Sequence, residues 1–181
     1  MELMELMRTR RSVRQYTDEK ISDEQIKQII TAGLLAPSGH SLYPCEFIVV
    51  KNRDTLNEMS HCRVGVAKML EQAAAAIAVV ADCDKSDTII EDAAVAMMNM
   101  ELMAWSMGIG NCWIQILGRD AEDHETSEDY LQGILDFPED FLCLAILSLG
   151  IPSKVPKPRE LDKIKFDRVH EENFKNPAPQ F

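Results

Sequence analysis

The amino-acid sequence predicts a single domain of the α+β class, and three observations lead to this prediction. The chain has 181 residues, a length that suits one domain with a substantial core. Its hydrophobic content of 46% and charged content of 27% are typical of a globular protein. Strand-like runs alternate with helical segments, but they lack the regular βαβ repeat of a doubly wound sheet. Residues 1–181 are therefore expected to form one folding unit.

The first half of the chain is expected to form two helices, a loop and a strand. Apolar residues at positions 3, 4, 6 and 7 suit a short N-terminal helix that ends near a cluster of arginines. Ser22 and Gln25 have the spacing of a capping box, which predicts a second helix that ends before Pro37. The residues APSGHSLYP, 36–44, indicate a loop by their proline, glycine and serine content. The run PCEFIVVK, 44–51, is typical of a strand.

The second half is expected to contain a long central helix among further strands. Residues 88–107 form a helical pattern that is apolar around most of its circumference and rich in methionine. Such a helix lies in a core or an interface, so we favour core packing plus a subunit contact over a methionine-rich ligand groove. The segment GIG, 108–110, is expected to end this helix. The other expected elements are helices over residues 64–76 and 130–138 and strands over residues 76–82, 111–118 and 142–152.

Two regions outside these elements are polar. Residues 120–129, DAEDHETSED, are expected to form a solvated acidic surface segment. From about residue 152 the chain becomes a proline-rich tail that is basic at first and has no globular packing pattern. A tail of this kind is either disordered or packed on another surface, such as that of a partner subunit.

Charge and composition exclude several classes of protein. With 30 acidic against 19 basic residues, a net charge of −11 and a pI near 4.8, the chain lacks the broad basic face of a nucleic-acid binder. The same balance disfavours an anionic membrane, and no apolar run reaches the roughly 20 residues that span a bilayer. The N-terminus MELMELMRTRR has acidic residues among its apolar ones, so a signal peptide is not expected.

The spacing of cysteines and histidines gives no sign of a metal site. The five cysteines are scattered and odd in number, without a CxxC pair, which indicates reduced thiols in a cytoplasmic protein. The four histidines form neither an HxxxH nor an HExxH pattern. No metal ligands are therefore expected.

Basic residues gather at two places in this acidic chain. The stretch RTRRSVRQYTDEKIS, residues 8–22, has four arginines in its first seven positions. A second basic group, Lys154, Lys157 and Arg159, stands among prolines near the C-terminus. The first group is either a solvated edge or a site for an anion. Neither a GxGxxG nor a P-loop pattern is present, so a bound phosphate would be held by side chains. Arginine suits that task because its planar guanidinium grips phosphate oxygens with two hydrogen bonds.

The order of the motifs resembles that of the FMN-dependent nitroreductase family. RRSVRQYTDEKIS is followed by a capped helix that ends in APS and then by the strand PCEFIVV. EDAAVAMMNMELMAWSMGIGNCWI is similar to the family's central helix, glycine turn and CWI segment, and LAILSLGIPSKVPKPRE is similar to its last core strand and phosphate-contacting tail. The resemblance covers roughly residues 8–170. It implies a three-layer α/β/α nitroreductase-like fold with a mixed central sheet and an extended C-terminal tail.

The resemblance also implies an FMN site built from both basic groups. Arg10, Arg11 and Ser12 would lie at the phosphate end of FMN. Lys157 and Arg159 would complete the phosphate site from the tail. In this interpretation the two basic groups converge on one dianion.

Other residues would lie against the flavin ring. The resemblance places Arg14 near the pyrimidine side, where a cation stabilises the anionic reduced flavin. The backbone N–H of Gln115 or Ile116 would face flavin N5. Because the family's flavin sites lie at a homodimer interface, one loop would come from the second subunit. That loop consists of Pro37, Ser38, Gly39, His40 and Ser41.

The implied function is that of an NAD(P)H-dependent flavin oxidoreductase. It would reduce nitroaromatic, quinone or similar small acceptors by a ping-pong mechanism, with NADH or NADPH as the electron donor. The redox reaction belongs to the flavin, so no dedicated catalytic side chain is expected. The expected partners are a second copy of the chain and a small-molecule acceptor, with no nucleic acid and no membrane. Two alternatives remain: a specialised flavoenzyme for one metabolite, and a flavin-binding protein without enzymatic activity.

The loop after APS departs from the family's pattern. Where the family commonly has N-x-Q-P-W, this chain has Ser41, Leu42, Tyr43, Pro44 and Cys45. A hydroxyl thus replaces an amide that usually hydrogen-bonds the ring, and a thiol replaces a tryptophan. The departure bears on redox tuning and on the class of substrate more than on the fold. Lys68 could be a further ring contact or a surface lysine.

Overall fold

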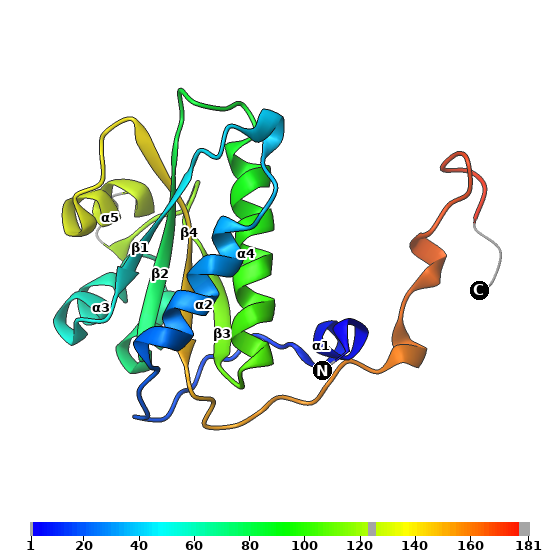
Figure 1. The fold of residues 1–181 in the computed structure, drawn as a ribbon, viewed down its shortest axis with the longest axis horizontal. Helices are drawn as coiled ribbons and strands as arrows, with labels where there is room; N and C mark the ends of the chain where they lie inside the picture. Colours follow the sequence, from blue (N-terminus) through cyan, green and yellow to red (C-terminus); the bar gives the residue numbers. More distant parts are fainter. Residues whose placement is uncertain (1, 123–125, 178–181) are drawn as a thin grey trace.

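In the computed structural model, which describes residues 2–122 and 126–177, a four-stranded sheet forms the centre of the molecule (Figure 1). The order of the strands is β1-β2-β4-β3. Their bounds are β1 Cys45–Val50, β2 Ala75–Asp82, β3 Gly110–Gln115 and β4 Phe141–Gly150. Each of the four strands that the sequence predicts is confirmed.

The α+β class is confirmed, but the expected mixed sheet needs a correction. All three pairs of neighbouring strands are antiparallel. β2 and β3 run in the same direction, as strands joined by a helix usually do, but β4 inserts between them and pairs antiparallel with both. Within the described part of the chain, parallel pairing is limited to the isolated bridge between Ser12 and Asn111.

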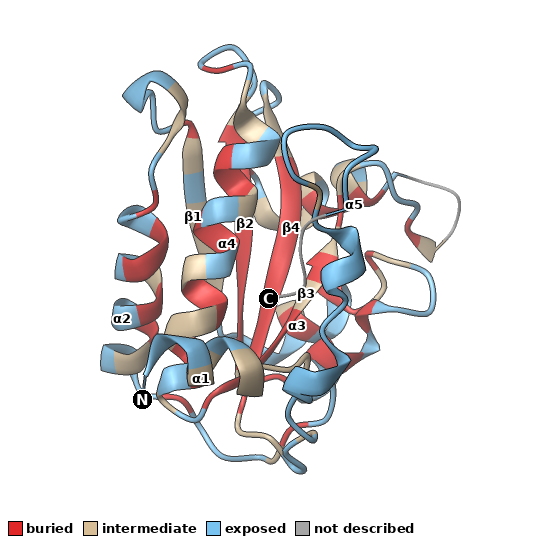
Figure 2. Ribbon diagram, turned by 90° about the vertical axis from the view of Figure 1, so that its right-hand side faces the viewer, coloured by how far each residue is buried: buried red, intermediate tan, exposed pale blue. Residues whose placement is uncertain are grey.

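Helices cover both faces of the sheet, so the three-layer arrangement is confirmed (Figure 1). One face packs against α2 (Asp23–Leu34) and α4 (Ile89–Ser106), and the other packs against α3 (Arg53–Met59) and α5 (Ser127–Leu135). Successive side chains of β2 point to opposite faces: Ile77 and Val79 join the core of the first face, and Ala78 and Val80 that of the second. Figure 2 shows β2 and β4 buried along most of their length.

The capping box predicted for α2 is present. The Ser22 hydroxyl accepts from the Gln25 backbone N–H at 3.2 Å, and the Gln25 side chain accepts from the Ser22 N–H at 2.9 Å. The helix then packs closely on α4, because a Cβ added at Gly33 would lie 3.0 Å from the Met100 sulfur. Met97 and Met100 are fully buried, which confirms α4 as a core helix. On its other side Ile90, Val95 and Met98 are exposed, and the subunit contact stays a prediction.

The prediction of a helix over residues 64–76 is wrong. The structure has α3 earlier in the chain and only a 3₁₀ helix, η2, over Ala67–Gln72. Gly65 has φ of +67°, a left-handed conformation that interrupts a continuous helix. The missed helix α3 has an N-terminal signal in the sequence, since the Asn52 side chain accepts from the backbone N–H of Thr55 at 3.0 Å.

Helix α1 and the start of the tail after β4 lie at the same end of the sheet as the C-terminus of α4 (Figure 1). Helix α1 spans Leu3–Thr9, and after β4 the tail leaves the body as an extended segment with the short 3₁₀ helices η4 (Leu161–Lys163) and η5 (Phe166–Arg168). Among the described residues, no helix combines the length and hydropathy of a membrane span. Residues 123–125 of the predicted acidic segment lie outside the described residues.

Candidate functional site

The N-terminal basic segment and the start of the tail lie side by side, in opposite directions. Backbone hydrogen bonds join Thr17 N–H to the Ile151 carbonyl at 2.9 Å and Ser153 N–H to the Gln15 carbonyl at 3.1 Å. Farther along, Arg159 N–H donates to the Arg8 carbonyl at 3.0 Å. Two basic groups that are nearly 150 residues apart in the sequence are thereby brought to one end of the molecule.

A pair of glycines makes this close packing possible. Gly110 of β3 and Gly150 of β4 are directly opposite each other in the sheet. A Cβ added at Gly150 would lie 2.5 Å from the Tyr16 ring, and one at Gly110 would lie 2.9 Å from Pro152. Tyr16 is buried there, and its hydroxyl donates to the Val13 carbonyl at 2.8 Å. The glycines therefore fix where the arginines on either side of Val13 emerge.

Most of the predicted phosphate-end residues gather around two adjoining pockets. Ser12 and Arg14 line the first together with Lys154, which the sequence had shown as basic but not as a site residue. Arg11, Lys157 and Arg159 line the second. Arg11 also donates from Nη1 to the Lys157 carbonyl at 2.5 Å, which ties the two segments together. Lys154 lies beside Arg14 because the two segments pair antiparallel, and this pairing cannot be read from the sequence.

Arg10 lies deeper than its neighbours and faces a buried carboxylate. Its Nη1 atom is 3.8 Å from Oε2 of Glu101 on α4, and the two side chains are 14% and 8% exposed. Burial raises the pKa of Glu101, and the charge of Arg10 only partly opposes this shift. Within the described residues, Nη1 of Arg10 and Oδ1 of the neighbouring Asn111 are buried without a hydrogen-bond partner. This Nη1 is the atom that faces Glu101, and Arg10 is not among the lining residues of the two pockets.

The end of β3 distinguishes between the two predicted backbone donors. The Ile116 N–H donates to the Leu144 carbonyl at 3.2 Å, so it is already used inside the sheet. Alternate residues of an antiparallel edge strand point their N–H groups outward, which directs the N–H of Gln115 away from β4. The Gln115 side chain accepts from Trp113 Nε1 at 3.0 Å. Of the two candidates, Gln115 has its N–H on the open edge.

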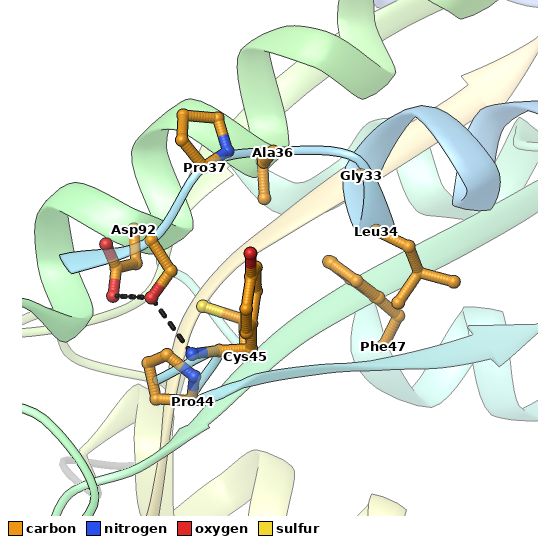
Figure 3. Close-up of a pocket in the computed structure, with 11 residues that line it drawn as sticks. Gly33, Leu34, Ala36, Pro37, Pro44, Cys45, Phe47 and Asp92 are labelled. Atoms are coloured by element: carbon orange, nitrogen blue, oxygen red, sulfur yellow. Dashed lines mark hydrogen bonds between the residues drawn. The ribbon is translucent and has the colours of Figure 1, made fainter. Parts of the chain in front are cut away.

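The loop predicted to come from a second subunit is held by a buried carboxylate at the start of α4. Asp92 accepts from the Ser38 hydroxyl and the Gly39 N–H, both at 2.9 Å, in the region drawn in Figure 3. His40 and Ser41 then adopt left-handed conformations, with φ of 52° and 58°, and are exposed. Pro37 lines the pocket of Figure 3 beside Tyr43 and Cys45. Burial, with a smaller effect of Asp92, raises the pKa of Cys45 to about 11, so its thiol is not activated.

The loop and the basic end lie at opposite ends of α4 (Figure 1). Asp92 is in the first turn of the helix, and Glu101 follows nine residues later, which corresponds to roughly 14 Å along the axis. One chain therefore does not bring residues 37–41 to the arginines.

The remaining candidate, Lys68, forms its ion pairs away from both the basic end and the loop of residues 37–41. Lys68 is half exposed and lies 3.4 Å from Glu71 and 4.0 Å from Glu122. Glu122 also pairs with His61 at 2.6 Å. Among residues 2–122 and 126–177, no cluster of three or more His, Cys, Asp or Glu side chains could hold a metal ion.

The fold and the site define a three-layer α+β protein with a basic end beside an open sheet edge. The chain belongs to the nitroreductase family, whose model matches residues 7–68 and 61–151. A relative from Archaeoglobus fulgidus is 36% identical over 178 residues, which are 96% of this chain and 99% of that protein. Its name covers NADH dehydrogenase and NAD(P)H nitroreductase.

Solved structures agree with this assignment. The FMN-dependent nitroreductase of Clostridium difficile R20291 has a TM-score of 0.93 and 34% identity, over 95% of this chain and all of that chain. The NADPH:FMN oxidoreductase of Vibrio harveyi, solved with NAD⁺, has a TM-score of 0.79 and 26% identity, over 94% of this chain and 77% of that chain.

Proposed function

We propose that this protein is an FMN-dependent NAD(P)H oxidoreductase that reduces nitroaromatic, quinone or similar small acceptors. The observation that carries the proposal is the convergence of two basic segments on one end of an acidic molecule. Membership of the nitroreductase family and the names of the relatives support the cofactor and the donor.

The residues at the basic end fit a flavin mononucleotide. Arg10 would add positive charge behind a phosphate dianion, and Ser12 would add a hydroxyl from the first pocket. Arg11, Lys157 and Arg159 would complete the phosphate site from the adjoining pocket. FMN has one such phosphate, which agrees with a site made of side chains and without a glycine-rich loop.

The ring would lie between Arg14 and the open edge of β3. Bound FMN would supply the redox chemistry, taking a hydride from NADH or NADPH and passing electrons to the acceptor in a ping-pong sequence. Arg14, which is exposed and shares a pocket with Lys154, would stabilise negative charge on the pyrimidine side. The outward N–H of Gln115 would donate to N5, whereas that of Ile116 is already used within the sheet.

The complete site would form in a homodimer. Residues 37–41 of one subunit would reach the basic end of the other, because a single chain holds the two groups at opposite ends of α4. Apolar side chains that are exposed in one chain would be covered at this interface. They include Leu34 at the end of α2 and Leu35 directly after it, Ile90, Val95 and Met98 of α4, and Phe166 of the tail. All five cysteines are free, which supports a reducing, cytoplasmic setting.

The test is an absorbance spectrum of the purified protein, followed by anaerobic titration with each nicotinamide. We expect a yellow protein whose flavin, released on denaturation, is FMN and is bleached by NADH or NADPH. Parallel lines in double-reciprocal plots would support the ping-pong sequence. Flavin that is bound but reduced by neither nicotinamide would instead favour a carrier without enzymatic activity.

A further inference from the structure

The tail forms a cationic groove with more positive charge than one FMN phosphate requires. Six basic side chains of the described residues line it: Arg11, Lys157, Arg159, Lys163, Lys165 and Arg168. The one acidic side chain among its described lining residues, Glu160, forms an ion pair with Lys163. A phosphate monoester carries at most about two negative charges at neutral pH. Several cations therefore stay unbalanced after FMN and Glu160 are counted, in a chain whose net charge is −11.

The local structure places two of these cations together. The Arg168 N–H donates to the Lys165 carbonyl at 3.3 Å in the 3₁₀ helix η5. Lys165 is the N-cap of this helix and Arg168 is its last residue, and both line the groove. Within the part of the chain that the structure describes, neither Lys165 nor Arg168 forms a salt bridge. Their donors are left for a ligand.

The groove is continuous with the phosphate end of the proposed FMN site. Arg11 and Arg159 belong to both, and the hydrogen bond from Arg159 N–H to the Arg8 carbonyl holds the tail against the body at 3.0 Å. A second phosphate held by Lys165 and Arg168 would therefore lie beside the first. The surplus of cations is what two neighbouring phosphates need to offset their mutual repulsion.

We propose that Lys165 and Arg168 bind the 2′-phosphate of NADPH, and that the protein therefore prefers NADPH to NADH. The proposal rests on the proposed function and adds which of the two donors is used. NADPH and NADH differ only in this phosphate. Arginine and lysine beside each other are a common means of binding such a group, the first by two parallel hydrogen bonds and the second as a point charge.

The test compares the double variant Lys165→Ala/Arg168→Ala with a control variant, Lys20→Ala/Lys27→Ala, which removes two exposed lysines outside the groove. We expect kcat/KM for NADPH to fall about tenfold or more in the groove variant, because charge-assisted hydrogen bonds are lost. The value for NADH and the bound FMN should change less than twofold. In calorimetry of the FMN-loaded proteins, 2′,5′-ADP should bind more tightly than 5′-ADP, and the groove variant alone should lose the difference.

Three results would overturn the proposal. The parent protein could use both nicotinamides equally well. In the groove variant, kcat/KM could fall equally for NADPH and NADH, which would mean that the groove binds the pyrophosphate that the two share. Or 2′,5′-ADP and 5′-ADP could bind alike. A protein that binds no FMN would contradict the proposed function instead, and calorimetry of the flavin-free protein with 2′,5′-ADP and 5′-ADP would still decide the role of the groove.

Discussion

The two ends of helix α4 each hold a buried carboxylate, and the two carboxylates differ in how many hydrogen bonds they accept. Asp92 at the N-terminal end accepts hydrogen bonds from the Ser38 hydroxyl and the Gly39 N–H at 2.9 Å and from the Thr88 hydroxyl at 3.3 Å. Glu101 at the C-terminal end has a loose contact of 3.8 Å with Arg10, whose Nη1 has no hydrogen-bond partner in the described structure. A satisfied network holds a loop in shape, whereas an incomplete one is suited to a ligand.

The largest effect on folding is expected at the N-terminal end of α4, where Asp92 accepts several hydrogen bonds. Asp92→Ala would leave the half-buried Ser38 hydroxyl and Gly39 N–H without their acceptor. Because each hydrogen bond to a charged group contributes roughly 1.5 to 3 kcal/mol, we expect the free energy of unfolding to fall by about 3 kcal/mol. Urea denaturation measures it, with Asp92→Asn as a milder control that keeps one acceptor oxygen. A loss for Asp92→Ala no larger than that for Asp92→Asn would show that the network does not support the loop.

At the Glu101 end of α4, replacing Arg10 and replacing Arg14 should have different effects on the bound flavin. Arg10→Ala would remove the charge that we propose pairs with the FMN phosphate, so FMN affinity should fall about ten- to a hundredfold with little change in midpoint potential. Arg14→Ala should weaken the reduced flavin more than the oxidised one and lower the midpoint potential. A differential loss of about 1.4 kcal/mol is tenfold in the binding ratio and about 30 mV for a two-electron couple. Titration and potentiometry of both variants test this. The opposite pattern would mean that the two assignments are reversed.

The smallest effect is expected from neutralising Glu101. Its pKa is raised by burial, so the folded state binds a proton more tightly than the unfolded state does. The stability of the parent protein should therefore fall as the pH rises from about 4.5 through the raised pKa, and then level off. Glu101→Gln should lack this fall and should be at least as stable as the parent at pH 8. Thermal denaturation from pH 4 to 8 measures it, and parallel pH profiles for the two proteins would contradict it.

The difference between the two ends also separates what the sequence could predict from what it could not. Hydrophobic runs and the capping box of Ser22 predicted the four strands and helices α2, α4 and α5, because these signals are local. The sequence does not show that residues 67–72 form only a 3₁₀ helix and that strand β2 already begins at Ala75. The two basic clusters were visible as charge.

The sequence does not show that Asp92 and Glu101 contact the candidate site residues. Asp92 meets Ser38 across 54 residues, and Glu101 meets Arg10 across 91. In the sequence both are ordinary acids of a mainly apolar helix, and only tertiary packing makes them buried partners. Lys154 was apparent as a basic residue, but its place beside Arg14 depends on the antiparallel pairing of the tail.

The central claim is that residues from opposite ends of α4 meet in one site through a second subunit, and mixing two damaged subunits tests it most directly. Ser41→Glu would disable the loop, and Lys157→Glu/Arg159→Glu would disable the basic end; all three residues are exposed, so folding should be retained. Each variant alone should bind almost no FMN. In a heterodimer purified with two different affinity tags, one intact site should reappear, giving about one FMN for every two chains. A heterodimer that binds no more FMN than either parent variant would contradict the shared site.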